Sequence, residues 1–176
     1  MAKLSVTTIH DIAKKLNVSA STVSRALNDN PLISESTRMA IKKTANEMGY
    51  RPNTLAASFR TNRTNTIGVI VPLINRYFFS SVISGIEDVA YTEGFAVTIS
   101  QSNDSYEKET KIAQTLFANR VDGLIISIGM QTTAFDHLRM FTEKKIPLVF
   151  FDRVVDEIEA HKIVVDDFGG GYRVTR

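Results

Sequence analysis

The sequence contains no cysteine among its 176 residues. This absence excludes disulfide bonds and thiolate metal sites, and it fits a reducing compartment such as the cytosol. Long hydrophobic runs are also absent. The longest, IGVIVPLI at residues 67–74, is too short to cross a bilayer and is interrupted by Pro72. The first residues, MAKLSVTTIHDIAKK, lack the apolar core of a signal peptide. We therefore expect a cytoplasmic protein with no membrane partner.

Motifs that are typical of enzymes are scarce as well. The glycine-rich stretch FGGGY, residues 168–172, matches neither a dinucleotide-binding loop nor a P-loop, and no GxSxG elbow occurs. The three histidines, His10, His137 and His161, are scattered, which argues against a catalytic triad or a metal site. We therefore expect no catalytic residue, no metal site and no cofactor.

Charge is distributed unevenly along the chain, although the formal net charge is only +2. Residues 1–63 contain 10 Lys and Arg against 4 Asp and Glu, which gives +6, and residues 64–176 contain 11 against 15, which gives −4. A basic head on an acidic body suggests a polyanionic partner for the head. A chance cluster of solvated lysines is the alternative.

The stretch TIHDIAKKLN, residues 8–17, predicts an amphipathic helix because its apolar residues recur at helical spacing. Thr8 followed by Asp11 is typical of a capping-box start. Asn17 suits the left-handed conformation at a helix end, and Ser19 can cap a second helix after a three-residue turn.

This second helix, in the stretch SASTVSRALN at residues 19–28, has two different sides at 100° per residue. The side expected to pack on the first helix carries Thr22, Val23, Ala26 and Leu27. The opposite side presents small donors and acceptors around a single guanidinium, and it carries Ser21, Ser24, Arg25 and Asn28.

A third helix is expected between Ser34, which can cap its start, and Gly49, which can end it. Two helices joined by a short turn and supported by a third helix form the helix-turn-helix plan, whose second helix enters the DNA major groove. On this interpretation Arg25 pairs with guanine, and Asn28 reaches a base or a phosphate. A plain three-helix bundle with a polar face is the alternative. The inward stripe of the third helix is expected to be Ile41, Ala45 and Met48.

Several motifs at fixed spacing make this pattern more specific. They are DIA at residues 11–13, VSASTVSRALN at 18–28, TRMAI at 37–41 and GYRPN at 49–53. Over residues 8–59 the sequence resembles the headpiece of the LacI/GalR family of bacterial transcriptional regulators. The resemblance implies a nucleoid-associated homodimer, most simply a repressor of a metabolic operon, that binds a near-palindromic double-stranded DNA operator. It implies base readout by Ala20, Ser21 and Arg25. It implies phosphate contacts by Thr8, Ser19, Thr22, Ser24, Asn28 and Ser34.

Residues 53–65 are expected to form a hinge helix and a linker. Pro52 stops a continuing helix, and TLAASFR at residues 54–60 is too short to be a stable helix alone in water. The resemblance implies a helix that forms on DNA and enters the minor groove, where Phe59 stands in the place of an expected leucine. Phenylalanine also serves as a minor-groove wedge, and packing of Phe59 on the body is the alternative. The implied hinge residues are Asn53, Ala56, Ala57 and Phe59.

From Thr66 onward, apolar strands alternate with helices, which predicts a doubly wound parallel α/β sheet. Strands are expected to start near Thr66, Phe95, Asp122 and Ile146, and KIVVD at residues 162–166 is expected to form another. The helix at about residues 78–93 is expected to turn one side inward, made of Val82, Ile83, Ile86, Val89 and Ala90.

Ligands of such sheets bind beyond the carboxyl ends of the strands. Polar and aromatic candidates for contact with a small polar ligand stand there, namely Asn75, Phe78, Phe79, Ser102, Asp104, Ser127, Asp152 and Arg153. Loop packing of the phenylalanines and a surface ion pair between Asp152 and Arg153 are the alternatives. The resemblance continues through VDGLIIS and IPLVFFDR and implies one lobe of a periplasmic-binding-protein-like domain with a sugar-like effector between two lobes.

The predicted organisation is an all-α helix-turn-helix headpiece at residues 1–52, the hinge and linker at 53–65, and an incomplete effector-binding and dimerisation domain at 66–176. Because members of the LacI/GalR family are nearly twice this long, we expect half an effector cleft that binds effector poorly and a weakened dimer. An α/β sugar or phosphosugar enzyme or sensor carrying a DNA-binding head is the alternative.

Overall fold

The computed structural model describes residues 7–51 and 63–175. The chain divides into two compact units, residues 1–57 and 58–176. The first unit is all-α and the second is α/β, so the predicted fold class is confirmed.

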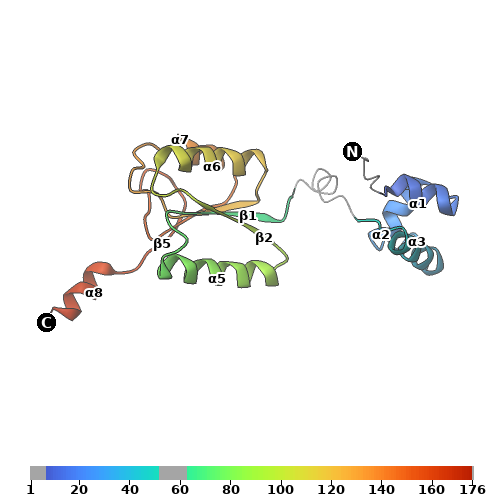
Figure 1. Cartoon of the computed structure of the whole chain (residues 1–176), viewed down its shortest axis with the longest axis horizontal. Helices are drawn as coiled ribbons and strands as arrows, with labels where there is room; N and C mark the ends of the chain where they lie inside the picture. Colours follow the sequence, from blue (N-terminus) through green and yellow to red (C-terminus); the bar gives the residue numbers. More distant parts are fainter. Residues whose placement is uncertain (1–6, 52–62, 176) are drawn as a thin grey trace. The chain divides into compact units, whose positions relative to one another are not determined.

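Within residues 7–51, the described part of the first unit, the helices are α1 (Ile9–Leu16), α2 (Ala20–Leu27) and α3 (Glu35–Glu47) (Figure 1). Their apolar sides meet in one small core that includes the buried side chains of Ile12, Val23, Ala26 and Ile41. Each helix buries only two or three residues and exposes its other side. This unit therefore folds around very little apolar material.

Short side chains fix the starts of these helices. Thr8 and Asp11 form the predicted capping box, in which the backbone N–H of Thr8 donates to Asp11 Oδ2 at 2.8 Å. Ser19 and Ser34 cap α2 and α3 by accepting a bond from the backbone N–H three residues later. Asn17 ends α1 at a φ of 51°, so three residues join α1 to α2, as the helix-turn-helix plan requires.

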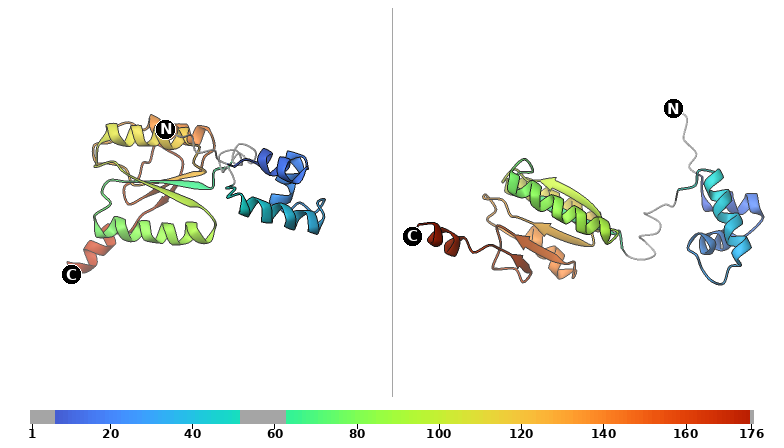
Figure 2. Two further views of the ribbon diagram at one scale, coloured as in Figure 1. Left: turned by 45° about the vertical axis from the view of Figure 1, so that its right-hand side comes forward. Right: turned by 90° about the horizontal axis from the view of Figure 1, so that it is seen from below.

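The second unit is built on a five-stranded sheet in the order β2-β1-β3-β4-β5, with every neighbouring pair parallel. Helix α5 (Tyr77–Thr92) covers one face, and α6 (Tyr106–Ala118) and α7 (Asp136–Glu143) cover the other (Figures 1 and 2). This is the predicted doubly wound arrangement. The strands are β1 (Thr66–Val71), β2 (Ala96–Gln101), β3 (Gly123–Ile126), β4 (Leu148–Phe151) and β5 (His161–Ile163).

An apolar core lies on each face of this sheet. The larger, under α6 and α7, includes the fully buried Ile126, Phe141 and Phe150, and the smaller, under α5, includes Val69 and Val71. Gly68 lets α6 approach β1, because a Cβ atom there would stand 2.9 Å from Leu116 Cδ1. The close packing of α6 on β1 therefore depends on a glycine, which has no side chain, at position 68.

The inward side predicted for α5 is wrong at one position. Val89 is 66% exposed, whereas Ala90 is buried. The inward stripe runs through Phe79, Ile83, Ile86 and Ala90, spaced by four, three and four residues. Val89 lies 100° away from Ala90 around the helix and so turns toward the helix flank.

The last described element is α8 (Asp167–Val174). Asp166 caps it by accepting a bond from the backbone N–H of Gly169 at 2.8 Å. Phe168 and Val174 are exposed. Within residues 7–51 and 63–175, no helix has the length and hydrophobicity that a membrane crossing requires.

Candidate nucleic-acid interface

The outer side of α2 is polar and open. Ser21 and Arg25 are exposed on the side opposite the buried Val23 and Ala26. No ion pair within residues 7–51 and 63–175 involves Arg25. Because the side chains around the guanidinium are small, a partner surface can approach the helix closely.

The Ser21 hydroxyl lies 2.8 Å from Ser19 Oγ, and the other predicted contact residues of α2 are also partly engaged within the first unit. Ala20 packs against the core, and the hydroxyl of Thr22 lies 2.8 Å from Ser19 Oγ. The side-chain amide of Asn28 donates to the carbonyl oxygen of the half-buried Ser24 at 2.6 Å. One N–H of Asn28 is therefore used to close the end of its own helix.

The N-termini of the three helices differ as sites for an anion. Unpaired N–H groups and the helix dipole favour anions at a helix start. The α1 start carries Asp11, whose pKa is lowered mainly by the hydrogen bond from the Thr8 side chain, so its negative charge opposes a phosphate. The α3 start carries Glu35. The α2 start, capped by Ser19, has no acidic residue in its first turn and so suits a phosphate best.

An acidic residue just after α2 is neutralised by α3. The Asp29 carboxylate lies 2.6 Å from Lys42 Nζ and 3.5 Å from Arg38 Nε. The hydrogen bond from Lys42 is the main cause that holds the pKa of Asp29 below its usual value. Arg38 also pairs with Glu35. These pairs reduce the repulsion that Asp29 would exert on a polyanion bound to α2.

The four predicted hinge residues, Asn53, Ala56, Ala57 and Phe59, lie outside the described residues. Their minor-groove contacts therefore stay predictions.

At the carboxyl edge of the sheet, the structure brings together four of the predicted effector residues from three separate loops. Arg153 Nη1 lies 2.5 Å from Asp104 Oδ1, and the Ser127 hydroxyl donates to Asp152 Oδ2 at 3.1 Å. The alternative of an Asp152–Arg153 ion pair is therefore wrong. The guanidinium reaches instead across to the loop after β2, 49 residues earlier in the chain.

Asp104 is held as a carboxylate by these contacts. Burial works to raise its pKa, but the backbone N–H of Met130 and the Arg153 guanidinium outweigh burial, and the pKa lies below its usual value. Because the Met130 N–H donates to Asp104 Oδ1 at 3.0 Å, the same carboxylate also fixes the loop between β3 and α7.

The remaining predicted effector residues differ in how far their side chains are exposed to solvent. Asn75 and Phe78 are exposed. Phe79 lies on α5 and is buried against Phe151, with ring centroids 6.1 Å apart, so packing describes it better than ligand contact, although the packing is that of a helix and not of a loop. Ser102 is fully buried, and its hydroxyl has no hydrogen-bond partner among the described residues.

Sequence reasoning missed a buried acid at this edge. Glu109 on α6 is fully buried, and it accepts bonds from the backbone N–H of Gly129 at 2.6 Å and the Thr132 hydroxyl at 3.0 Å. His137 Nε2 lies 2.9 Å from Glu109 Oε1, the same oxygen that accepts the bond from Thr132. A signal was available, because Glu109 stands one turn before Ala113 on the inward stripe of α6, where an apolar residue is the rule.

A helix-turn-helix unit followed by a doubly wound sheet with a polar carboxyl edge defines a class of two-part proteins that pair a DNA-reading fold with a ligand-binding fold. Residues 8–53 match the family described as bacterial regulatory proteins, lacI family, and residues 67–175 match a periplasmic binding protein domain. The chain belongs to the lacI family of bacterial regulatory proteins.

Known relatives agree with this assignment. The chain is 33% identical over 171 residues to the HTH-type transcriptional regulator DegA of Bacillus subtilis, covering 97% of this chain and 51% of the relative. It is 31% identical over 159 residues to catabolite control protein A of Priestia megaterium, covering 90% and 47%. A solved lac repressor dimer, bound to operator and an anti-inducer, matches with a TM-score of 0.79 at 25% identity, covering 97% of this chain and 53% of that one. The chain thus spans about half the length of the relatives that it matches.

Proposed function

We propose that this chain is the operator-reading part of a DNA-binding transcriptional regulator, most simply a repressor, and not an enzyme. The observation that carries the proposal is the outer side of α2, where Arg25 and Ser21 are exposed beside a capped helix start that lacks acidic residues. A major groove admits a helix of this kind.

Each contact has a distinct chemical role in this proposal. Arg25 donates two bonds to the O6 and N7 atoms of a guanine, Ser21 bonds to a base edge, and Ala20 contacts a thymine methyl group. A second group of polar side chains, five hydroxyls and the amide of Asn28, contacts phosphates and sets the register of α2 on the duplex. This group comprises Thr8, Ser19, Thr22, Ser24, Asn28 and Ser34, of which Ser19 caps the helix start that lacks an acidic residue.

The proposal extends to a homodimer that binds two half-sites of a near-palindrome in the cytoplasm, with Phe59 as a wedge in the central minor groove. The polar carboxyl edge of the sheet, with Asp104, Asp152 and Arg153, is proposed as one wall of a site for a small sugar-like effector. The anti-inducer bound to the lac repressor is a precedent for an effector in a relative.

The test is selection of binding sites from random duplex DNA by the purified chain at physiological salt, with Arg25→Ala as the matched control. Enrichment of a short palindrome or its half-site, lost or relaxed at one base pair in the variant, would support the proposal. Salt-sensitive retention of DNA without any sequence preference would refute it.

A further inference from the structure

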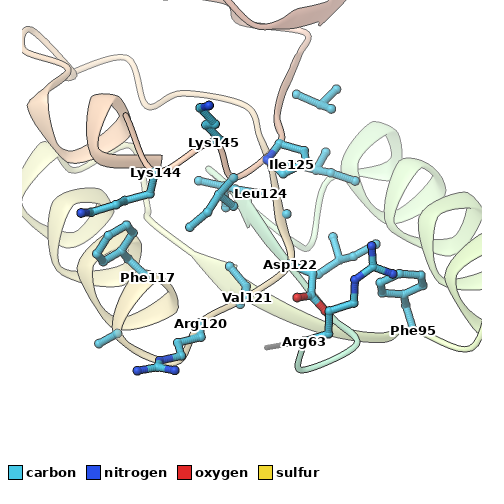
Figure 3. Close-up of a pocket in the computed structure, with 16 residues that line it drawn as sticks. Arg63, Phe95, Phe117, Arg120, Val121, Asp122, Leu124, Ile125, Lys144 and Lys145 are labelled. Carbon is cyan, nitrogen blue, oxygen red and sulfur yellow. The ribbon is translucent and has the colours of Figure 1, made fainter. Parts of the chain in front are cut away.

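A cavity of about 1060 Å³ opens at the amino-terminal edge of the sheet, at the end of the strands opposite Asp104 and Arg153. Its floor is apolar and includes Val121 and Leu124. Figure 3 shows basic side chains set around this floor. They are Arg63, Arg120, Lys144 and Lys145.

This edge carries a positive charge that the rest of the unit does not share. Residues 63–176 contain twelve Lys and Arg against fifteen Asp and Glu, yet four of the twelve line this one cavity with a single carboxylate, Asp122. The formal charge of the lining is therefore +4 − 1 = +3. The Asp122 carboxylate accepts hydrogen bonds from the backbone N–H groups of Thr64 and Asn65, at 3.1 and 2.6 Å.

The topology of the sheet explains how these cations gather. Arg120 follows the end of α6, and Lys144 and Lys145 follow the end of α7, where the helix dipole favours positive charge. In a parallel sheet with helical crossovers, all such helix ends lie at the same edge, where each following strand begins. Arg63 joins them because it precedes β1.

We infer that this edge binds phosphates of duplex DNA, as a non-specific contact additional to that of the first unit, and the inference rests on the function proposed above. The four cations surround a wide opening and do not converge on one point (Figure 3), which suits a row of phosphates better than a single small anion. Only residues 52–62 separate Arg51 from Arg63, and an extended chain of that length spans at most about 40 Å. DNA held by the first unit is thus always at high effective concentration near this edge.

The experiment measures how DNA affinity falls with salt. The full-length chain is titrated onto a fluorescent 40-base-pair duplex of mixed sequence over a series of KCl concentrations. The test variant is Lys144→Gln/Lys145→Gln. The matched control is Lys108→Gln/Lys111→Gln, which removes the same charge from exposed positions of α6.

The slope of log K against log salt should become shallower by about 1 to 2 in the test variant, since each lost phosphate contact contributes about 0.9. The control should keep the wild-type slope. Equal slopes in all three proteins, or the same loss in both variants, would overturn the inference while leaving the function proposed above intact. Failure of the wild-type chain to bind DNA at all would instead overturn the proposed function. Thermal stabilisation of the wild type by inorganic phosphate alone, absent in the test variant, would assign the edge to a small anion and refute the DNA contact.

Discussion

Replacing Glu109 with alanine should be among the most damaging single substitutions in the second unit. The carboxylate is fully buried and serves Gly129, Thr132 and His137 together. Its removal leaves three polar groups that were satisfied by one side chain, and a buried polar group without a partner costs about 1–3 kcal/mol. Because water can enter part of the vacated space, we expect a total loss of about 3–5 kcal/mol in the free energy of unfolding. That is a large share of the roughly 5–15 kcal/mol that stabilises a typical domain.

Urea unfolding followed by tyrosine fluorescence measures this loss. Four of the five tyrosines lie in the second unit, so the signal reports mainly on it. With a slope of about 2 kcal/mol per molar urea, the midpoint should fall by about 2 M. Glu109→Gln should lie between wild type and Glu109→Ala, because the amide keeps one acceptor oxygen. Glu107→Ala, at an exposed position of the same helix, should leave the midpoint unchanged.

A shift of less than about 0.5 M for Glu109→Ala would refute the claim that the three contacts stabilise the unit. A double-mutant cycle with His137→Ala provides a second check. The two losses should be clearly non-additive, because the side chains are in direct contact.

Three further predictions follow from the contacts described above. Arg25→Ala should weaken operator binding by about 1–3 kcal/mol and relax the preference at one base pair. Binding to a panel of single-base operator variants measures both effects. Uniform weakening across the panel would show that Arg25 contacts a phosphate and not a base. Gly68→Ala should lower the free energy of unfolding by about 1–3 kcal/mol, because the added Cβ would press on Leu116. Gly85→Ala is the control, since nothing lies within 4 Å of its added Cβ, and it should be neutral or slightly stabilising. Equal melting temperatures for the two variants would contradict this prediction. Asp104→Asn should be less stable than wild type at pH 7, and the difference in stability should shrink as the pH falls below about 4. The reason is that a carboxyl group with a lowered pKa stabilises the fold only while it is ionised. A pH-independent difference between the two urea midpoints would show that the charge of Asp104 is not involved.

Much of the first unit could be predicted from the sequence because its signals are local. The partners of a helix cap lie three residues apart in the chain, so Thr8 with Asp11, Ser19 and Ser34 all identify helix starts without knowledge of the fold. The parallel, doubly wound character of the sheet in the second unit followed from the alternation of strands and helices, since parallel strands need helical crossovers. The strand order β2-β1-β3-β4-β5 was not predicted.

The features that could not be predicted from the sequence depend on contacts between residues that lie far apart in the chain. Arg153 pairs with Asp104 and not with its neighbour Asp152, because adjacent residues at a strand end point in different directions. Val89 is apolar but faces outward, since a stripe of 3.6-residue period passes through only some of the apolar positions. The role of Glu109 required the loop after β3 to be in place, and no local pattern reveals that loop.

The small core of the first unit has a consequence for how variants of this protein should be interpreted. A unit of about fifty residues that buries only two or three side chains per helix has little stability of its own. A duplex present at a hundred times its dissociation constant adds about 2.7 kcal/mol to whatever folded unit binds it. On the function proposed above, bound DNA would then stabilise the folded first unit, and substitutions that destabilise the core at Ile12 or Val23 would weaken DNA binding although both side chains are buried.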